Sequence, residues 1–66
     1  MTDEDVLKGK WKQLRGKAKE RWGKLTDDEL DQVDGSEDQL VGLLQEHYGY
    51  AREQAKNEVN RWVERQ

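Results

Sequence analysis

The sequence contains no cysteine and no proline. Without cysteine, no disulfide can crosslink the chain and no thiolate can bind a metal ion. This absence also fits a reducing compartment, so we expect a cytoplasmic protein. Without proline, no residue with a fixed φ angle and a missing N–H interrupts a helix. These absences favour a helical protein that is stabilised by side-chain packing alone.

Long apolar runs are also missing, since apolar residues make up 32% of the sequence and are scattered through it. A membrane-spanning helix needs about 18 or more consecutive apolar residues. The segment Met1–Asp5 is acidic and is not followed by the apolar stretch of a secretory signal. We therefore expect neither a membrane span nor a secretion signal.

The chain is short and highly charged, with 66 residues of which 41% are charged. This length predicts one domain, residues 1–66, with a core that contributes only about 3–5 kcal/mol. A composition this polar raises the question of disorder, but disordered chains are poor in aromatic residues. This chain has three tryptophans and two tyrosines. We therefore predict a folded protein of marginal stability.

Apolar residues recur at helical spacing in four segments, which predicts an all-α fold of four short helices. The helices are expected at about 8–23, 27–34, 37–48 and 51–64. The residues expected to face the core are Leu7, Trp11, Leu14, Ala18, Trp22, Leu25, Leu30, Val33, Leu40, Val41, Leu43, Leu44, Tyr48, Ala51, Ala55, Val59, Trp62 and Val63.

Capping motifs mark the boundaries of these helices. Thr26–Glu29 and Ser36–Gln39 both have the spacing of a capping box, in which a hydroxyl and a side chain three residues later satisfy free backbone N–H groups. Gly23, Gly35 and Gly49 stand where the preceding helices are expected to end.

The six glycines reveal an internal repeat at an offset of 26 residues. At this offset Gly9, Gly16 and Gly23 coincide with Gly35, Gly42 and Gly49, and Trp22 coincides with Tyr48. We interpret the repeat as an approximate duplication of a helix pair, which predicts two packed helical hairpins. The alternative is a chance match. If Gly9, Gly23, Gly35 and Gly49 cap helix ends, only Gly16 and Gly42 lie in helix interiors.

The first predicted helix is rich in basic residues. Residues 1–25 hold eight basic and four acidic side chains, for a charge of +4, whereas residues 26–66 have a charge of −7. The candidate contacts to a polyanion are Lys10, Lys12, Arg15, Lys17, Lys19 and Arg21. These side chains could bind phosphates of DNA or RNA weakly. We favour the alternative, a solvated helix face, because the rest of the chain is acidic and contains no nucleic-acid-binding motif.

No set of residues indicates catalysis or a cofactor. His47 is the only histidine, and without a nucleophile or a second histidine we expect it at the margin of the core beside Tyr48. The acidic residues between Asp27 and Asp38 do not match a calcium-binding loop, and helix capping accounts for most of them. We therefore expect no enzyme activity, no cofactor, no metal and no small-molecule substrate.

Two stretches resemble the CsbD-like family of small bacterial proteins. They are G-K-W-K-Q-L-R-G-K-A-K-E-R-W-G-K-L-T from Gly9 and D-Q-L-V-G-L-L-Q-E-H-Y-G-Y from Asp38. The resemblance covers about residues 8–63. It implies an all-helical fold of two packed hairpins and induction in general stress responses, with no catalytic residue or cofactor to transfer. The predicted function is thus that of a non-enzymatic stress-response protein, monomeric, with an unknown partner. The alternative is weak nucleic-acid association.

Overall fold

Helices make up most of residues 3–66, the part of the chain that a computed structural model describes, with side chains from Glu4 onward. The elements are α1 (Asp3–Arg21), α2 (Asp27–Val33), α3 (Glu37–Tyr48) and α4 (Arg52–Glu64). The predicted all-α fold is confirmed. The expected hairpin arrangement and the 26-residue duplication stay predictions.

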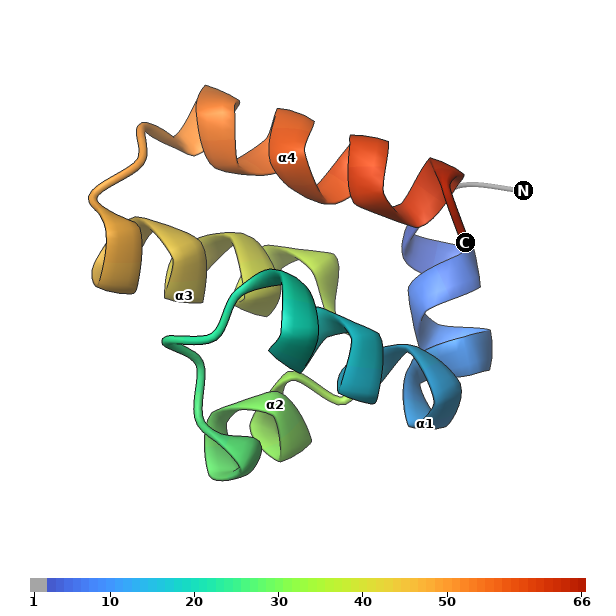
Figure 1. Ribbon diagram of the computed structural model, residues 1–66. Coiled ribbons are helices and arrows are strands. Elements are labelled where there is room, and N and C mark those ends of the chain that lie inside the picture. The colour runs from blue at the N-terminus through green and yellow to red at the C-terminus, as the bar shows by residue number, and fades with distance from the viewer. Residues whose placement is uncertain (1–2) are drawn as a thin grey trace.

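The helices pack around one core (Figure 1). α3 and α4 lie side by side in opposite directions and make the most extensive contact between helices. α1 contacts α4, α2 and α3, and the short α2 packs against α3 and α1. Every helix therefore touches at least two others, and no helix depends on a single neighbour.

Helix α1 differs most from its prediction. It begins at Asp3 instead of residue 8 and ends at Arg21 instead of residue 23. Acidic residues favour the positive end of a helix, which explains the earlier start. A bend interrupts the helix at Lys10, whose φ of −121° and ψ of 16° are not helical. Two helical segments meet at this bend, and Gly9 lies at the end of the first one, which agrees with the expectation that it stands at a helix end. Glycine is a common cause of such bends because it stabilises a helix poorly.

The core consists of the apolar faces predicted from the sequence, with three exceptions. Leu43 and Tyr48 are only partly buried, and Ala51 is exposed. Ala51 was expected to face inward, but its backbone is extended at the N-cap of α4, off the helical face. The buried residues are Leu7, Trp11, Leu14, Ala18, Trp22, Leu25, Leu30, Val33, Leu40, Val41, Leu44, Ala55, Val59, Trp62 and Val63.

The three tryptophans connect helices through the core. The rings of Trp22 and Trp62 form a T-shaped pair with centroids 5.1 Å apart, which joins the end of α1 to α4. The indole nitrogen of Trp11 donates a hydrogen bond of 2.9 Å to the carbonyl oxygen of Leu30 in α2. An aromatic pair such as Trp22 and Trp62 contributes about 0.5–1.5 kcal/mol to stability beyond its buried area. The prediction that Trp11 and Trp22 serve the core is confirmed.

The predicted caps are present at α2 and α3. The Thr26 hydroxyl accepts a hydrogen bond from the Glu29 N–H, and the Glu29 carboxylate accepts one from the Thr26 N–H, which completes the capping box. At α3, the Ser36 hydroxyl accepts from the Gln39 N–H, but the Ser36 N–H donates to the carbonyl oxygen of Val33, so this predicted capping box is only half formed. Gly49 ends α3 with a φ of 71°, in the left-handed region that favours glycine.

Gly35 was expected to end α2, but Asp34 takes the left-handed C-cap position with a φ of 45°, and Gly35 shapes the turn that follows. Its φ is 83°, and a Cβ atom built on it would lie 2.6 Å from the Cα atom of Lys8. The turn after α2 therefore approaches the backbone of α1 more closely than any side chain permits. This contact lies next to the bend at Gly9 and Lys10, so it fixes where the first turns of α1 meet the rest of the molecule.

Candidate functional site

Half of the basic residues predicted to contact a polyanion have partners within the protein. Arg15 forms an ion pair with Asp31 of α2. The Lys19 ammonium donates a hydrogen bond of 2.6 Å to the carbonyl oxygen of Leu25. The Arg21 guanidinium lies 2.8 Å from a carboxylate oxygen of Glu58 in α4. These three side chains hold α1 to its neighbours, although exposed ion pairs contribute only about 0–1 kcal/mol each.

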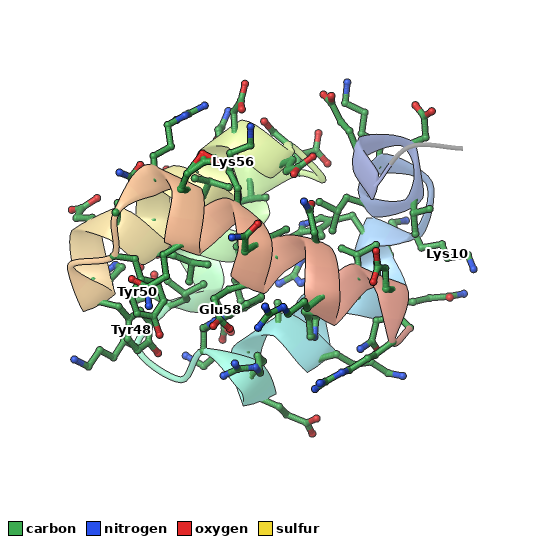
Figure 2. The ribbon with its side chains drawn as sticks, turned by 90° about the horizontal axis from the view of Figure 1, so that it is seen from above. Lys10, Tyr48, Tyr50, Lys56 and Glu58 are labelled. Atoms are coloured by element: carbon green, nitrogen blue, oxygen red, sulfur yellow. The ribbon has the colours of Figure 1, made fainter. Side chains whose placement is uncertain are left out.

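The other three predicted residues are Lys10, Lys12 and Lys17. All three side chains are exposed, and none has a hydrogen bond or ion pair with another residue within 3–66. Lys12 and Lys17 are five positions apart, which separates them by about 140° around a helix. Lys10 lies at the bend in α1, well away from Tyr48 and Tyr50 (Figure 2). The free lysines therefore flank α1 and do not form a single patch.

His47 lies at the margin of the core, as predicted, where it joins α3 to the start of α2. Its Nε2 atom is 2.8 Å and 3.0 Å from the two carboxylate oxygens of Glu29. The backbone N–H of Thr26 and then the His47 side chain lower the pKa of Glu29 below its ordinary value of 4.5. Glu29 thus serves the helix cap and the contact to α3 at once, so the histidine has a structural partner.

Two tyrosines form a small aromatic cluster at the end of α3. The rings of Tyr48 and Tyr50 stack with centroids 5.5 Å apart. The Lys24 ammonium lies 5.0 Å from the centre of the Tyr48 ring, and the Lys24 N–H donates to the Tyr48 hydroxyl. This cluster anchors the loop after α1 to α3.

Two basic residues outside the predicted set, Arg61 and Arg65, lie near Arg21. A hollow of about 300 Å³ lies between the C-terminal ends of α1 and α4. We refer to it as the arginine hollow, and its lining residues are Arg21, Glu58, Arg61, Trp62, Arg65 and Gln66. The spacing of Arg61 and Arg65 places both on one side of a helix, which is a signal in the sequence. The approach of Arg21 depends on the packing of α1 against α4, and no local pattern reveals it.

Two other kinds of site can be assessed over residues 3–66. In this range no three side chains among His, Asp and Glu come together in a way that could hold a metal ion. No helix in the same range combines the length and the apolar character needed to span a bilayer.

The family model described as CsbD-like matches residues 5–57. The chain belongs to the CsbD-like family. The matched residues include nearly all of α1, all of α2 and α3, and the first part of α4, so Arg61 and Arg65 of the arginine hollow lie beyond them.

Several bacterial proteins are similar to this CsbD-like protein over most of their length. A UPF0337 protein of Pseudomonas aeruginosa is 59% identical over 92% of this chain and 94% of its own. A UPF0337 protein of Pectobacterium atrosepticum is 57% identical over 91% of this chain and 87% of its own. The UPF0337 protein YjbJ of Escherichia coli is 52% identical over 96% of this chain and 91% of its own. No solved structure matches the chain significantly.

Proposed function

We propose that this CsbD-like protein serves the general stress response of a bacterium by binding another molecule, without catalysis. Its family membership supports this proposal, since the resemblance to CsbD-like proteins implies induction under stress. The observation that carries the non-enzymatic part is the surroundings of His47, the type of side chain best suited to proton transfer near neutral pH. Within residues 3–66 its hydrogen bonds go to Glu29, whose carboxylate also caps α2, and none goes to a hydroxyl group that it could activate as a nucleophile.

The proposal is tested in the bacterium that encodes the protein. The gene is deleted, and survival is measured after osmotic, heat and stationary-phase stress, together with the abundance of the protein before and after each stress. We expect abundance to rise under at least one stress and survival of the deletion strain to fall. Unchanged abundance and unchanged survival in all three would contradict the proposal.

Complementation tests whether the folded protein is needed. A wild-type copy and a copy with Trp22→Ala are compared, because loss of the Trp22 side chain from the core unfolds a protein this small. We expect only the wild-type copy to restore survival. Immunoprecipitation from the stressed cells then identifies the partner, fractionation tests the expected cytoplasmic location, and light scattering tests the expected monomer.

Weak association with nucleic acid is the second candidate function. The exposed and unpaired ammonium groups of Lys10, Lys12 and Lys17 favour it. Its test is binding of duplex DNA at about 50 and 200 mM salt, because each phosphate contact contributes about 0.9 to the slope of log affinity against log salt. We expect substitution of all three lysines by glutamine to flatten this slope, and Lys56→Gln on α4 to leave it unchanged. Absence of binding at the lower salt concentration would eliminate this candidate.

A further inference from the structure

The arginine hollow concentrates positive charge in an otherwise acidic protein. The chain as a whole has a net charge of −3. The hollow is lined by three arginines and one glutamate, which gives a local charge of +2. Its volume of about 300 Å³ lies at the lower end of the range for small-molecule sites in proteins. This combination of charge and concavity suits a small anion.

The position of Arg21 is fixed before any ligand binds. Its guanidinium lies 2.8 Å from Glu58 and 5.5 Å from the centre of the Trp22 ring. Figure 2 shows Glu58 on the side of α4 that faces the C-terminal part of α1. A guanidinium has five N–H donors, so the ion pair leaves Arg21 with donors for a second acceptor. Glu58 therefore orients the Arg21 side chain and leaves some of its N–H donors available.

Arg61 and Arg65 supply the remaining charge. They are four residues apart at the end of α4, and both side chains are exposed. Neither guanidinium has a hydrogen bond or an ion pair with any other residue in the range 3–66. Two free guanidinium groups at this spacing can reach the same anion, because residues four apart are neighbours on a helix surface.

The negative end of α4 does not fully account for these arginines. Cations stabilise helix C-termini, chiefly through the last unpaired carbonyl groups. In α4 the Trp62 carbonyl accepts from the Gln66 side-chain amide, and the Val63 carbonyl accepts from the Gln66 N–H. Since backbone and amide groups already satisfy these carbonyls, Arg61 and Arg65 are available to another acceptor.

We propose that the arginine hollow binds the phosphate group of a small molecule. A phosphate dianion offers several acceptor oxygens, and the guanidinium fork matches their geometry with two parallel hydrogen bonds. Arg61 and Arg65 bind the phosphate, and Arg21 closes the site from α1. This inference goes beyond the proposed function, because it names a ligand class and uses residues apart from Lys10, Lys12 and Lys17.

The probe for this site is inorganic phosphate, titrated into the full chain at constant ionic strength while NMR follows the arginine Nε–H and tryptophan indole signals. We expect saturable shifts at Arg21, Arg61, Arg65 and Trp62, and no such shifts when acetate replaces phosphate. Shifts that are linear in phosphate and spread over the whole surface would overturn the proposal.

Substitutions then locate the binding. The double variant Arg61→Gln with Arg65→Gln should weaken phosphate binding about tenfold or more, because it removes two charge-assisted contacts. Lys56→Gln is a control for the loss of a positive charge elsewhere, since it removes one charge from the side of α4 that lies away from Glu58 (Figure 2). We expect the control to bind phosphate as tightly as the wild type. Equal binding by the double variant would contradict the proposal.

Two further measurements keep the result unambiguous. Circular dichroism establishes that the double variant is folded, which we expect because both arginines are exposed. A second double variant, Arg61→Lys with Arg65→Lys, keeps both positive charges but lacks the paired N–H donors of a guanidinium. We expect its affinity for phosphate to lie between those of the wild type and the glutamine variant. Failure of phosphate binding would not affect the outcome of the stress-survival experiment or of the lysine-dependent DNA binding. The phosphate site and the proposed function can therefore fail separately.

Discussion

The two faces of α1 have opposite characters. On the inward face, Leu7, Trp11, Leu14 and Ala18 are at most 6% exposed, and Trp22 directly after the helix continues this face with 1% exposure. On the outward face, Lys12, Gly16 and Lys17 are exposed, and a Cβ atom added at Gly16 would meet no atom within 4 Å. The inward face therefore determines the fold. Substitutions on the outward face can change function and leave the fold intact.

The largest effect is expected from Trp22→Ala on the inward face. Removal of this indole leaves a cavity next to Trp62 and should cost about 3–5 kcal/mol, which is comparable to the whole stability of a domain this size. Circular dichroism should show loss of most helical signal at 25 °C. Lys12→Ala, on the same helix and exposed, is the control and should keep the wild-type spectrum. A folded Trp22→Ala variant with unchanged stability would break the comparison.

Gly35→Ala should have the next largest effect, because it alters the contact between α1 and the turn after α2. The new methyl group would meet the Lys8 backbone and would also require a positive φ, which together should cost about 2–5 kcal/mol. Urea denaturation measures this loss. Gly49→Ala has a similar φ and open space around it, so it should lose only about 1–2 kcal/mol. Equal losses at the two sites would mean that the close approach to Lys8 contributes nothing.

A smaller effect of opposite sign is expected from Gly16→Ala on the outward face. Alanine is about 1 kcal/mol more favourable than glycine in a helix interior, and the added methyl group meets no neighbour. The melting temperature should therefore rise by a few degrees, about 4–8 °C per kcal/mol. Gly42→Ala in α3 should behave in the same way, since its surroundings are also open. A fall in melting temperature would reveal that another molecule packs on this face.

The smallest effect concerns the acid stability of the contact between α2 and α3. The pKa of Glu29 is lower in the folded protein than its ordinary value of 4.5. The charged form of Glu29 is therefore favoured by folding, so its contribution is present above about pH 4.5 and disappears as the pH falls through the lower folded pKa. Urea denaturation between about pH 6 and pH 3 should show a shallower decline for Glu29→Gln than for the wild type. Parallel pH profiles would contradict this assignment.

The predictable parts of the fold are those that local chemistry determines. The capping box at Thr26, the cap at Ser36 and the end of α3 at Gly49 follow from residue types at fixed spacing. The bounds of α3 match the sequence prediction at both ends. The buried positions of α1 follow from helical periodicity, which a bend after Gly9 does not disturb because the apolar spacing continues through it.

The unpredictable parts depend on residues that meet only after folding. Periodicity cannot distinguish Arg15 and Arg21, which pair with α2 and α4, from Lys12 and Lys17, which remain free. The arginine hollow was missed for the same reason, since it needs Arg21 beside Arg61. The local sequence therefore identified the charged residues of α1, but it did not reveal which of them form ion pairs with other helices.

Helix α2 has only 7 residues, and a helix of two turns is unstable by itself in water. Its order depends on the docking of Leu30 and Val33 in the core and on the Trp11 hydrogen bond to Leu30. The amide protons of α2 should consequently exchange with deuterium whenever this segment undocks, ahead of those in the middle of α3. The Trp11 indole proton should give the same free energy of opening once its own intrinsic exchange rate is allowed for, so this one resonance reports the opening of the whole segment.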